Sequence, residues 1–345
     1  MPRYLAGMLK LSILDQSTAA AGRGQDQAIR ETLALAEQAE ALGYQRFWVS
    51  EHHNHDSIVG TAPEILMAAI AARTSRIRIG SAGVMLPHYN ALKVAEQFRV
   101  LDALAPGRID IGVGRAPGAD RRTAYALNPH AHMSEADEFP AQVRDLEGWL
   151  AGYTPAEGDP RHGIRALPQS PTRPDLWMLG SSNYGAQLAA HFGLPYSFAY
   201  FITDGRGADE ALEIYRRYFK PGQALTRPLA SVCVWALAAE TRAEAEHQFM
   251  TRARWRQARD RGELLALQTP EAALAYDYSP AERAKLERDR QHALIGTPAE
   301  LGARLRKLAA ELQVEELVIL TWTHDPTVKL KSYQLLAREF NLSGS

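Results

Sequence analysis

Short runs of hydrophobic residues alternate along the chain with longer segments in which hydrophobic residues recur every three or four positions. The short runs are typical of buried strands, and the longer periodicity is typical of helices that pack on one face. The pattern predicts strands over residues 8–14, 46–50, 76–82, 108–113, 175–179, 196–200, 229–238 and 316–321. It predicts helices over residues 25–42, 63–73, 91–104, 134–151, 184–192, 208–218, 242–259 and 327–340, with an additional helix over 298–312.

Eight strands, each followed by a helix, indicate an α/β fold of the (β/α)8 TIM-barrel type rather than an open, doubly wound sheet. Several strands are hydrophobic almost throughout, as expected of parallel strands that are covered on both faces. Capping residues support the helix limits: Ser134 with Asp137 and Thr241 with Glu244 mark two starts, and Gly43 marks the end of the first helix.

Two segments interrupt the repeat, one before the fifth strand (153–172) and one between the seventh and eighth strands (262–296). Long insertions in a compact domain are often lids or binding loops. No linker rich in Pro, Gly or Ser divides the chain, so a single domain is expected over residues 1–345. Residues 1–7 are expected to form a disordered extension.

The composition excludes several classes of function. The formal net charge is −1, so no global electrostatic field favours nucleic acid or an anionic membrane surface. The single cysteine, Cys233, cannot form an intrachain disulfide and fits a reducing compartment. The sequence shows no signal peptide and no run of roughly 20 apolar residues. These features predict a cytoplasmic protein without a nucleic-acid or membrane partner.

In a barrel of this type, the loops that follow the strands form the active face. Polar or very small residues occupy five of these positions: Asp15 and Gln16, then Glu51, His52, His53 and His55, then Ala82 and Gly83, then Gly114 and Arg115, and finally residues 180–183. The small residues after the third strand would let a flat ligand lie directly on the backbone. The sequence therefore predicts one shared ligand site.

Two of these strand ends are suited to an anion. Residues 180–185 read Gly-Ser-Ser-Asn-Tyr-Gly and lead into a helix, whose free N–H groups bind anions well. The segment is equally consistent with a phosphate site and with an ordinary helix cap. Arg115 presents a guanidinium fork that suits phosphate, or it forms a salt bridge across the barrel mouth. Gly112 and Gly114 form only a weak match to a Rossmann fingerprint, because Pro117 stands at the position of the last glycine.

The histidines after the second strand favour acid–base chemistry over metal binding. Adjacent residues such as His52 and His53 point to opposite sides of an extended segment, and the other strand ends supply few metal ligands. No metal site is therefore expected. A histidine with an ordinary pKa beside a flat cofactor would serve as a general acid or base. The alternative for His53 is a hydrogen-bonded pair with Glu51 that only shapes the loop.

The sequence resembles the bacterial luciferase-like flavin monooxygenases, and it is most similar to their single-chain-type oxidoreductase group. The resemblance is densest over residues 10–118 and recurs over 179–185, 296–298 and 316–320. Its motifs are Leu14-Asp15-Gln16-Ser17, Ser50-Glu51-His52-His53, Ala62-Pro63-Glu64, Gly80-Ser81-Ala82-Gly83-Val84-Met85-Leu86-Pro87, Leu92-Lys93-Val94-Ala95-Glu96-Gln97-Phe98, and residues 106–118.

The resemblance implies that reduced FMN binds across the barrel mouth, with a cis peptide bond between Ala82 and Gly83 against its ring. It implies that Arg115 and Ser181, with the backbone N–H groups of residues 182–185, hold the FMN phosphate. The expected cofactor-binding residues are Ala82, Gly83, Arg115, Gly180, Ser181, Ser182, Tyr184 and Gly185. His52 matches the family's catalytic histidine, and we place Glu51 beside it in the catalytic set.

The implied reaction is a monooxygenation. Reduced FMN, supplied by a separate flavin reductase, reacts with O2 to give a flavin C4a-hydroperoxide, which transfers one oxygen to a small apolar or carbonyl-containing substrate. Gly114 stands where the light-emitting family members have a cysteine, which argues against efficient light emission. We expect residues 262–294, residues 153–172, Tyr125 and Tyr200 to determine substrate specificity. A homodimer is expected through helices 63–73 and 91–104.

Three other functions fit parts of the pattern. A deazaflavin (F420)-dependent hydride-transfer enzyme would use the same barrel but would need a basic pocket for the acidic tail of its cofactor. A flavin-binding protein without turnover would keep the cofactor site alone. A metal-dependent barrel hydrolase would contain stoichiometric zinc and no flavin.

Overall fold

The computed structural model describes residues 9–116, 120–130, 137–222 and 225–343. The extension expected over residues 1–7 and the helix start expected at Ser134 lie outside these ranges.

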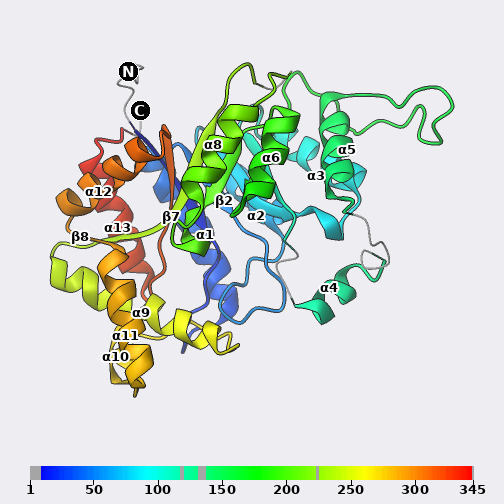
Figure 1. Cartoon of the computed structure of the whole chain (residues 1–345). Helices are drawn as coiled ribbons and strands as arrows, with labels where there is room; N and C mark the ends of the chain where they lie inside the picture. Colours follow the sequence, from blue (N-terminus) through cyan, green and yellow to red (C-terminus); the bar gives the residue numbers. More distant parts are fainter. Residues whose placement is uncertain (1–8, 117–119, 131–136, 223–224, 344–345) are drawn as a thin grey trace.

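Eight parallel strands close into a barrel, which confirms the predicted (β/α)8 fold (Figure 1). The order around the barrel is β1-β2-β3-β4-β5-β6-β7-β9, and β9 pairs with β1 to close it. The strands are β1 (Lys10–Asp15), β2 (Arg46–Val49), β3 (Arg78–Met85), β4 (Ile109–Gly114), β5 (Asp175–Gly180), β6 (Tyr196–Ala199), β7 (Ala230–Ala238) and β9 (Glu316–Leu320).

Helices surround the barrel, and most of them bury an apolar face against the outward side of the strands. They are α1 (Gln25–Ala41), α2 (Pro63–Ala71), α3 (Ala91–Leu104), α4 (Arg121–Leu127), α5 (Phe139–Ala151), α6 (Asn183–Phe192), α7 (Tyr200–Thr203), α8 (Ala208–Tyr218), α9 (Arg242–Asp260), α10 (Pro270–Ala275), α11 (Pro280–His292), α12 (Pro298–Glu311) and α13 (Pro326–Glu339), with a 3-10 turn over Leu86–His88.

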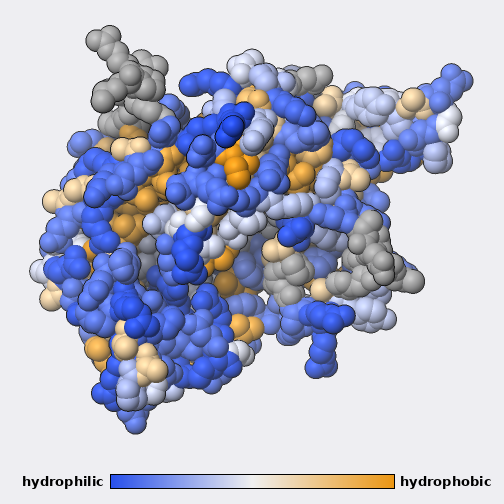
Figure 2. All heavy atoms as spheres, in the orientation of Figure 1, coloured by the Kyte–Doolittle hydropathy of each residue, from blue (hydrophilic) through white to orange (hydrophobic). Residues whose placement is uncertain are grey.

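The insertion over residues 262–296 contains structure that the sequence pattern did not predict. Its helices α10 and α11 are followed by a short strand, β8 (Leu294–Gly296), which pairs with the end of β7. Helix α11 has no buried residue, so it carries none of the hydrophobic periodicity by which helices are recognised. The lobe formed by α9, α10 and α11 is accordingly mostly hydrophilic in Figure 2.

The insertion over residues 153–172 lies far from the active face. It precedes β5, so it joins a helix to the start of a strand, and such loops lie at the amino-terminal end of a parallel barrel. Figure 1 shows it projecting beyond α5, at the end of the barrel away from α4 and α9.

Inward-facing side chains fill the barrel in layers because alternate residues of a strand point to the same side. Leu14, Trp48, Trp177 and Val318 belong to the apolar cluster inside the barrel, and their strand neighbours belong to the outer cluster under the helices. Below this apolar layer, the interior at the amino-terminal end is polar.

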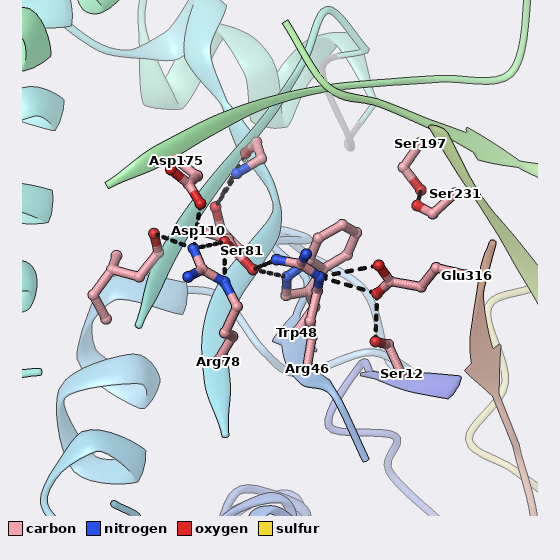
Figure 3. A network of polar contacts seen from close by, with 12 residues as sticks. Ser12, Arg46, Trp48, Arg78, Ser81, Asp110, Asp175, Ser197, Ser231 and Glu316 are labelled. Carbon is pink, nitrogen blue, oxygen red and sulfur yellow. Dashed lines mark hydrogen bonds and ion pairs between the residues drawn. The ribbon is translucent and has the colours of Figure 1, made fainter. Parts of the chain in front are cut away.

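Arg46 is the centre of that polar layer (Figure 3). Its guanidinium donates to Asp110 at 2.8 Å and to Glu316 at 2.9 Å. Asp110 also accepts from Trp48 Nε1 at 3.0 Å, and Glu316 accepts from Ser12 Oγ at 2.5 Å. Four strands of the barrel thus meet in one network of buried charges.

Arg78 extends the network to a fifth and a sixth strand. Its guanidinium donates to Asp110 and to Asp175, each at 2.5 Å, and therefore joins β3, β4 and β5. Burial opposes the charge of Arg46, but the carboxylates of Asp110 and Glu316 outweigh it and raise the pKa of that guanidinium.

None of the helices in the described part of the chain is both long and apolar enough to span a membrane.

Arg46→Met should destabilise the fold by about 3–5 kcal/mol because it leaves the carboxylate of Glu316 buried without its cation and removes one of the two arginines that pair with Asp110. Arg73→Met is the control, since Arg73 pairs with Glu37 on the surface and such pairs contribute about 1 kcal/mol or less. Urea unfolding followed by circular dichroism measures both. Equal and small shifts of the two midpoints would contradict a stabilising role for the network.

Candidate active site

A cavity of about 490 Å³ opens at the carboxyl ends of the barrel strands. Its walls include inward-facing residues at the strand ends, the first turn of α6 and one face of α9. Nine of the ten residues expected in the site line this cavity: His52, Ala82, Gly83, Arg115, Gly180, Ser181, Ser182, Tyr184 and Gly185. The structure therefore brings together residues that lie up to 133 positions apart in the sequence, counted from His52 to Gly185.

Glu51 is the tenth residue, and it lies behind the cavity wall. It is 2% exposed, and its carboxylate is 2.7 Å from His53 Nε2 and accepts from Tyr89 at 2.5 Å and from the backbone N–H of Met85 at 3.1 Å. These contacts fasten the loop after β2 to the end of β3. The structure thus shows the Glu51–His53 pair that shapes the loop.

The inward-facing positions of β3 and β4 are small because neighbouring strands supply the bulk. A Cβ on Gly83 would lie 2.6 Å from Leu179 Cδ1, and one on Gly112 would lie 2.3 Å from the carbonyl oxygen of Ser81. Packing within the protein therefore requires small residues here. From the sequence alone, a flat ligand was the only reason expected for them. Ala82 and Gly83 still line the cavity, and the bond between them is cis, as the resemblance implies.

Gly114 is different from these glycines, because a Cβ at this position would meet nothing within 4 Å. The end of β4 therefore faces open space in the cavity. A ligand lying over this strand end would not clash with a side chain.

The first turn of α6 forms one end of the cavity. Ser182 is its N-cap residue, but its side chain does not cap the helix, so the first N–H groups lack the partner that a capping side chain supplies. A Cβ on either Gly180 or Gly185 would lie 3.4 Å from the Cα of the other. This close approach of strand and helix places the helix start, with Ser181, directly at the cavity.

Arg115 stands beside this helix start. Its guanidinium lies 4.1 Å from the centre of the Tyr184 ring and 3.6 Å from Asp137, to which the Tyr184 hydroxyl also donates. The side chain is about half exposed, with 54% of its area accessible. Arg115 therefore combines the two expected roles, an ion pair at the barrel mouth and a cation facing the cavity.

His52 lines the cavity as a neutral imidazole. Burial, followed by the charges of His55 and His53, lowers its pKa to about 4. The expectation of an ordinary pKa was wrong, because the sequence could not reveal how deeply the ring is buried. Ser50 Oγ lies 3.3 Å from Nδ1, which leaves Nε2 as the nitrogen available to a ligand.

His55 is a cavity residue that the expected set omitted. Its Nδ1 accepts from the backbone N–H groups of Ser57 and Ile58 at 3.1 and 3.2 Å, so Nε2 carries the proton. Its ring stacks on Trp255 at 6.2 Å. The position of His55 in the loop after the second strand was the available signal.

Aromatic residues and arginines form the end of the cavity opposite α6. Trp235, Trp255, Trp322 and Phe201 line it together with Arg252, Arg256 and Arg259. The rings of Trp255 and Trp322 meet edge to face at 4.5 Å. Helix α9 therefore supplies most of the polar groups on this side.

The two insertions expected to determine specificity do not line the cavity, since no described residue of 153–172 or 262–294 belongs to its walls. Tyr125 and Tyr200 do not line it either, but the surroundings of Tyr200 do, through Ala199, Phe201 and Ile202. Residues 153–172 lie at the other end of the barrel. The second insertion contacts the loop after β2 outside the cavity, where Leu265 O accepts from Ser57 Oγ at 2.5 Å. One face of α9 lines the cavity in place of these loops.

Within the described ranges, no cluster of three or more His, Cys, Asp and Glu residues is arranged to hold a metal ion.

Comparison with known proteins gives matches over nearly the whole chain. The model of a family described as luciferase-like monooxygenase matches residues 9–316. The uncharacterized protein YwcH of Bacillus subtilis is 42% identical over 337 residues, which cover 96% of this chain and 99% of YwcH. The N-acetyl-S-alkylcysteine monooxygenase of the same organism is 36% identical over 334 residues, which cover 96% of this chain and 98% of that enzyme.

Solved structures agree with these matches. The structure of apo-MsnO8 has a TM-score of 0.87 at 36% identity and covers 97% of this chain and 98% of that one. Two distant structures share the fold alone. One is the FMN complex of the oxygenating constituent of 3,6-diketocamphane monooxygenase from Pseudomonas putida, with a TM-score of 0.71, 19% identity and coverage of 96% and 97%. The other is an F420-dependent secondary alcohol dehydrogenase, with a TM-score of 0.66, 14% identity and coverage of 97% and 99%.

The low pKa of His52 predicts a specific titration. The folded protein keeps this ring neutral, whereas the unfolded chain binds a proton near the ordinary pKa of 6.5. The contribution of His52 to the free energy of unfolding should therefore fall as the pH drops from about 6.5 to about 4. Carbon–proton NMR of the imidazole rings, assigned with His52→Gln, should show a midpoint near pH 4. A midpoint near 6.5 would contradict the buried, neutral ring.

Proposed function

The chain belongs to the luciferase-like monooxygenase family, and from this premise we propose that it uses reduced FMN and O2 to oxygenate a small organic substrate. We further propose that a separate flavin reductase supplies the reduced FMN. The observation that carries the proposal is the donor set at one end of the cavity, where Arg115 lies beside the uncapped first turn of α6.

This donor set fits a phosphate group. Arg115 offers a guanidinium, and Ser181 and Ser182 offer hydroxyls. The first N–H groups of α6 lie at the positive end of the helix dipole. These residues would hold the phosphate of FMN. The open space above Gly114 and the small residues at the end of β3 fit the flat ring beside it.

The remaining residues would supply orientation, water exclusion and a proton site. Bound reduced FMN supplies the electrons and the activation of O2 through which one oxygen atom reaches the substrate. The apolar walls, with Trp48, Trp322 and Leu320 among them, exclude water from the reacting groups. His52, neutral at pH 7, can accept a hydrogen bond or a proton at Nε2 without bringing a positive charge into the cavity.

Two cofactors occur among structural neighbours, since one distant neighbour binds FMN and another binds F420. The family match and the 36% identity to a named monooxygenase support the oxygen-using reaction over hydride transfer. Anaerobic titration separates the two, because reduced FMN should bind and F420 should not. Binding of F420 in preference to reduced FMN would overturn the proposal.

Arg115→Ala should weaken binding of reduced FMN by about 1.5–3 kcal/mol, or roughly 10- to 100-fold, because it removes a charge-assisted phosphate contact. Riboflavin lacks the phosphate, so its affinity should not change. Arg122→Ala on the exposed side of α4 is the matched control. Anaerobic fluorescence titration measures the affinities of the two variants and of the unmodified protein for reduced FMN and for riboflavin. An equal loss for FMN and riboflavin would contradict a phosphate-binding role of Arg115.

Turnover is tested by admitting oxygen to the loaded protein. The N-acetyl-S-alkylcysteines named for one relative provide the first substrates to try. With ¹⁸O2, mass spectrometry should detect one labelled oxygen atom in the product. Reoxidation of the flavin without labelled product for any substrate tried would favour a flavin-binding protein without turnover.

We also propose that the protein forms a homodimer through α2 and α3. Three large hydrophobic side chains are exposed on these neighbouring helices: Ile65 at 66%, Val100 at 49% and Leu104 at 61%. Val100 and Leu104 lie one turn apart, so they occupy the same face of α3. A second copy of this chain would cover an apolar face that water otherwise contacts.

The double variant Val100→Glu/Leu104→Glu should be monomeric, because four carboxylates would then meet in the proposed interface. Size-exclusion chromatography with light scattering should give twice 38.1 kDa for the unmodified protein and 38.1 kDa for the variant. Tyr218→Glu, a change at an exposed residue of α8 on another side of the barrel, should leave the mass unchanged. A monomeric unmodified protein would refute the proposal.

A further inference from the structure

Two arginines of α9 face the cavity from the side opposite α6. Arg252 and Arg256 lie four residues apart, so one helical turn separates them and they share a face. Both are buried, with 7% and 9% of their areas exposed. Guanidinium groups are rarely buried to this extent without carboxylate partners.

One carboxylate serves both guanidinium groups. Asp204, which ends the short helix α7, accepts from Arg256 at 2.8 and 2.5 Å, whereas its closest approach to Arg252 is 3.9 Å. Arg252 makes no hydrogen bond to any described residue, and its guanidinium lies 4.5 Å from the Trp235 ring. Arg256 Nε is likewise buried without a partner in the described structure. Within ion-pair distance the two cations thus share one described carboxylate, and Asp289 acts on both only from farther away.

The rest of the cavity does not correct this imbalance. Its lining includes Arg115, Arg252, Arg256 and Arg259, and none of the described lining residues is Asp or Glu. Arg259 has a carboxylate of its own, Asp260, at 2.9 Å. Burial, followed by the charge of Arg256, lowers the pKa of Arg252 to about 9, as expected of a cation short of counter-charge. An incoming anion would relieve this condition.

We propose that Arg252 and Arg256 form a subsite for a carboxylate of the substrate, and that the substrate is an organic acid with an apolar body. The apolar body fits the aromatic walls next to the arginines, where Trp235, Trp255 and Trp322 line the cavity. The inference rests on the proposed function for the reaction, but not for the binding of the acid. It adds a carboxylate to the small apolar or carbonyl-containing substrate expected from the resemblance.

The subsite is separate from the proposed phosphate site. Arg115 follows β4, whereas Arg252 belongs to the helix that follows β7. Three strand steps separate β4 from β7 in a barrel of eight, so the two groups face each other across the mouth. A ligand held at Arg115 and a substrate held at Arg252 would therefore meet inside the barrel mouth. His52 and Gly83 also line the cavity there.

The test measures binding to the flavin-free protein by isothermal titration calorimetry. The probes are 4-phenylbutyrate and its methyl ester, which share the apolar body and differ in charge. The acid should bind at least 10-fold more tightly than the ester. Arg252→Gln should weaken the acid by about 10- to 100-fold and leave the ester unchanged, because a charge-assisted contact is lost. Arg252→Lys, which keeps the charge, should retain part of the preference.

Arg254→Gln is the matched control, since Arg254 lies on the same helix, is equally buried at 9%, and stacks on Tyr276 outside the cavity. It should leave the affinity for both probes unchanged. Equal affinities for acid and ester, or an Arg252→Gln protein that binds the acid normally, would overturn the proposal.

A cofactor anion is the other source of negative charge that the arginines could meet, and a second arm distinguishes it. Reduced FMN and riboflavin should bind Arg252→Gln as they bind the unmodified protein. A loss confined to FMN would assign Arg252 to the cofactor phosphate and overturn the substrate subsite. Failure of FMN to bind the unmodified protein would refute the proposed function while leaving the result with 4-phenylbutyrate intact.

Discussion

The pairing of Arg46 with Asp110 and Glu316 is the constraint on which the barrel depends. The three side chains are inside the barrel, where an unpaired charge is costly, so their strands must keep the register that joins them. A slip of one residue would turn Asp110 toward the helices and leave Arg46 with half of its counter-charge. The same register fixes which residues stand at the other end of each strand. The polar layer at one end of the barrel therefore positions the residues of the cavity at the opposite end.

The cavity above this layer has a consistent electrostatic character. The pKa values of both its histidines, His52 and His55, are lowered, no carboxylate belongs to the described lining, and its cations are arginines, which remain charged even when buried. Positive charge is concentrated at two places, beside α6 and along α9, with aromatic and aliphatic walls between them. Such an arrangement favours ligands that carry negative charge at their ends and apolar or flat groups in the middle.

The sequence was sufficient for the barrel and for most of the proposed cofactor end, because both depend on local patterns. Strand alternation, the small residues at 80–83 and the Gly-Ser-Ser segment are each visible within a few positions. The substrate end was missed because Arg252 and Arg256 occur in a strongly charged helix that reads as solvent-exposed. Only the packing of α9 over the barrel mouth shows that one face of it is buried. The pKa of His52 was missed for the same reason, since burial is a tertiary property.

The role expected for residues 153–172 could have been corrected from the sequence, because a segment that precedes a strand lies at the end of the barrel away from the active face. The helices α10 and α11 could not have been predicted from the sequence pattern. Helix α11 in particular has no buried residue and therefore leaves no periodic signal.

Asp204 makes the binding of an anion an addition at Arg252 but an exchange at Arg256, because only Arg256 is already hydrogen-bonded to a carboxylate. Any anion that reaches Arg256 must compete with a carboxylate already held there by two hydrogen bonds. The affinity for an anion at Arg256 therefore reflects the difference between the ion pair that it forms and the ion pair that Asp204 already forms. Anions that bond weakly or fit the site poorly lose more affinity by this exchange than strongly bonding ones. Asp204 also terminates the helix that carries Phe201 and Ile202 to the cavity wall. Displacement of Asp204 by a bound anion would loosen this part of the cavity wall. The mobility of α7 would then depend on the charge of the bound ligand.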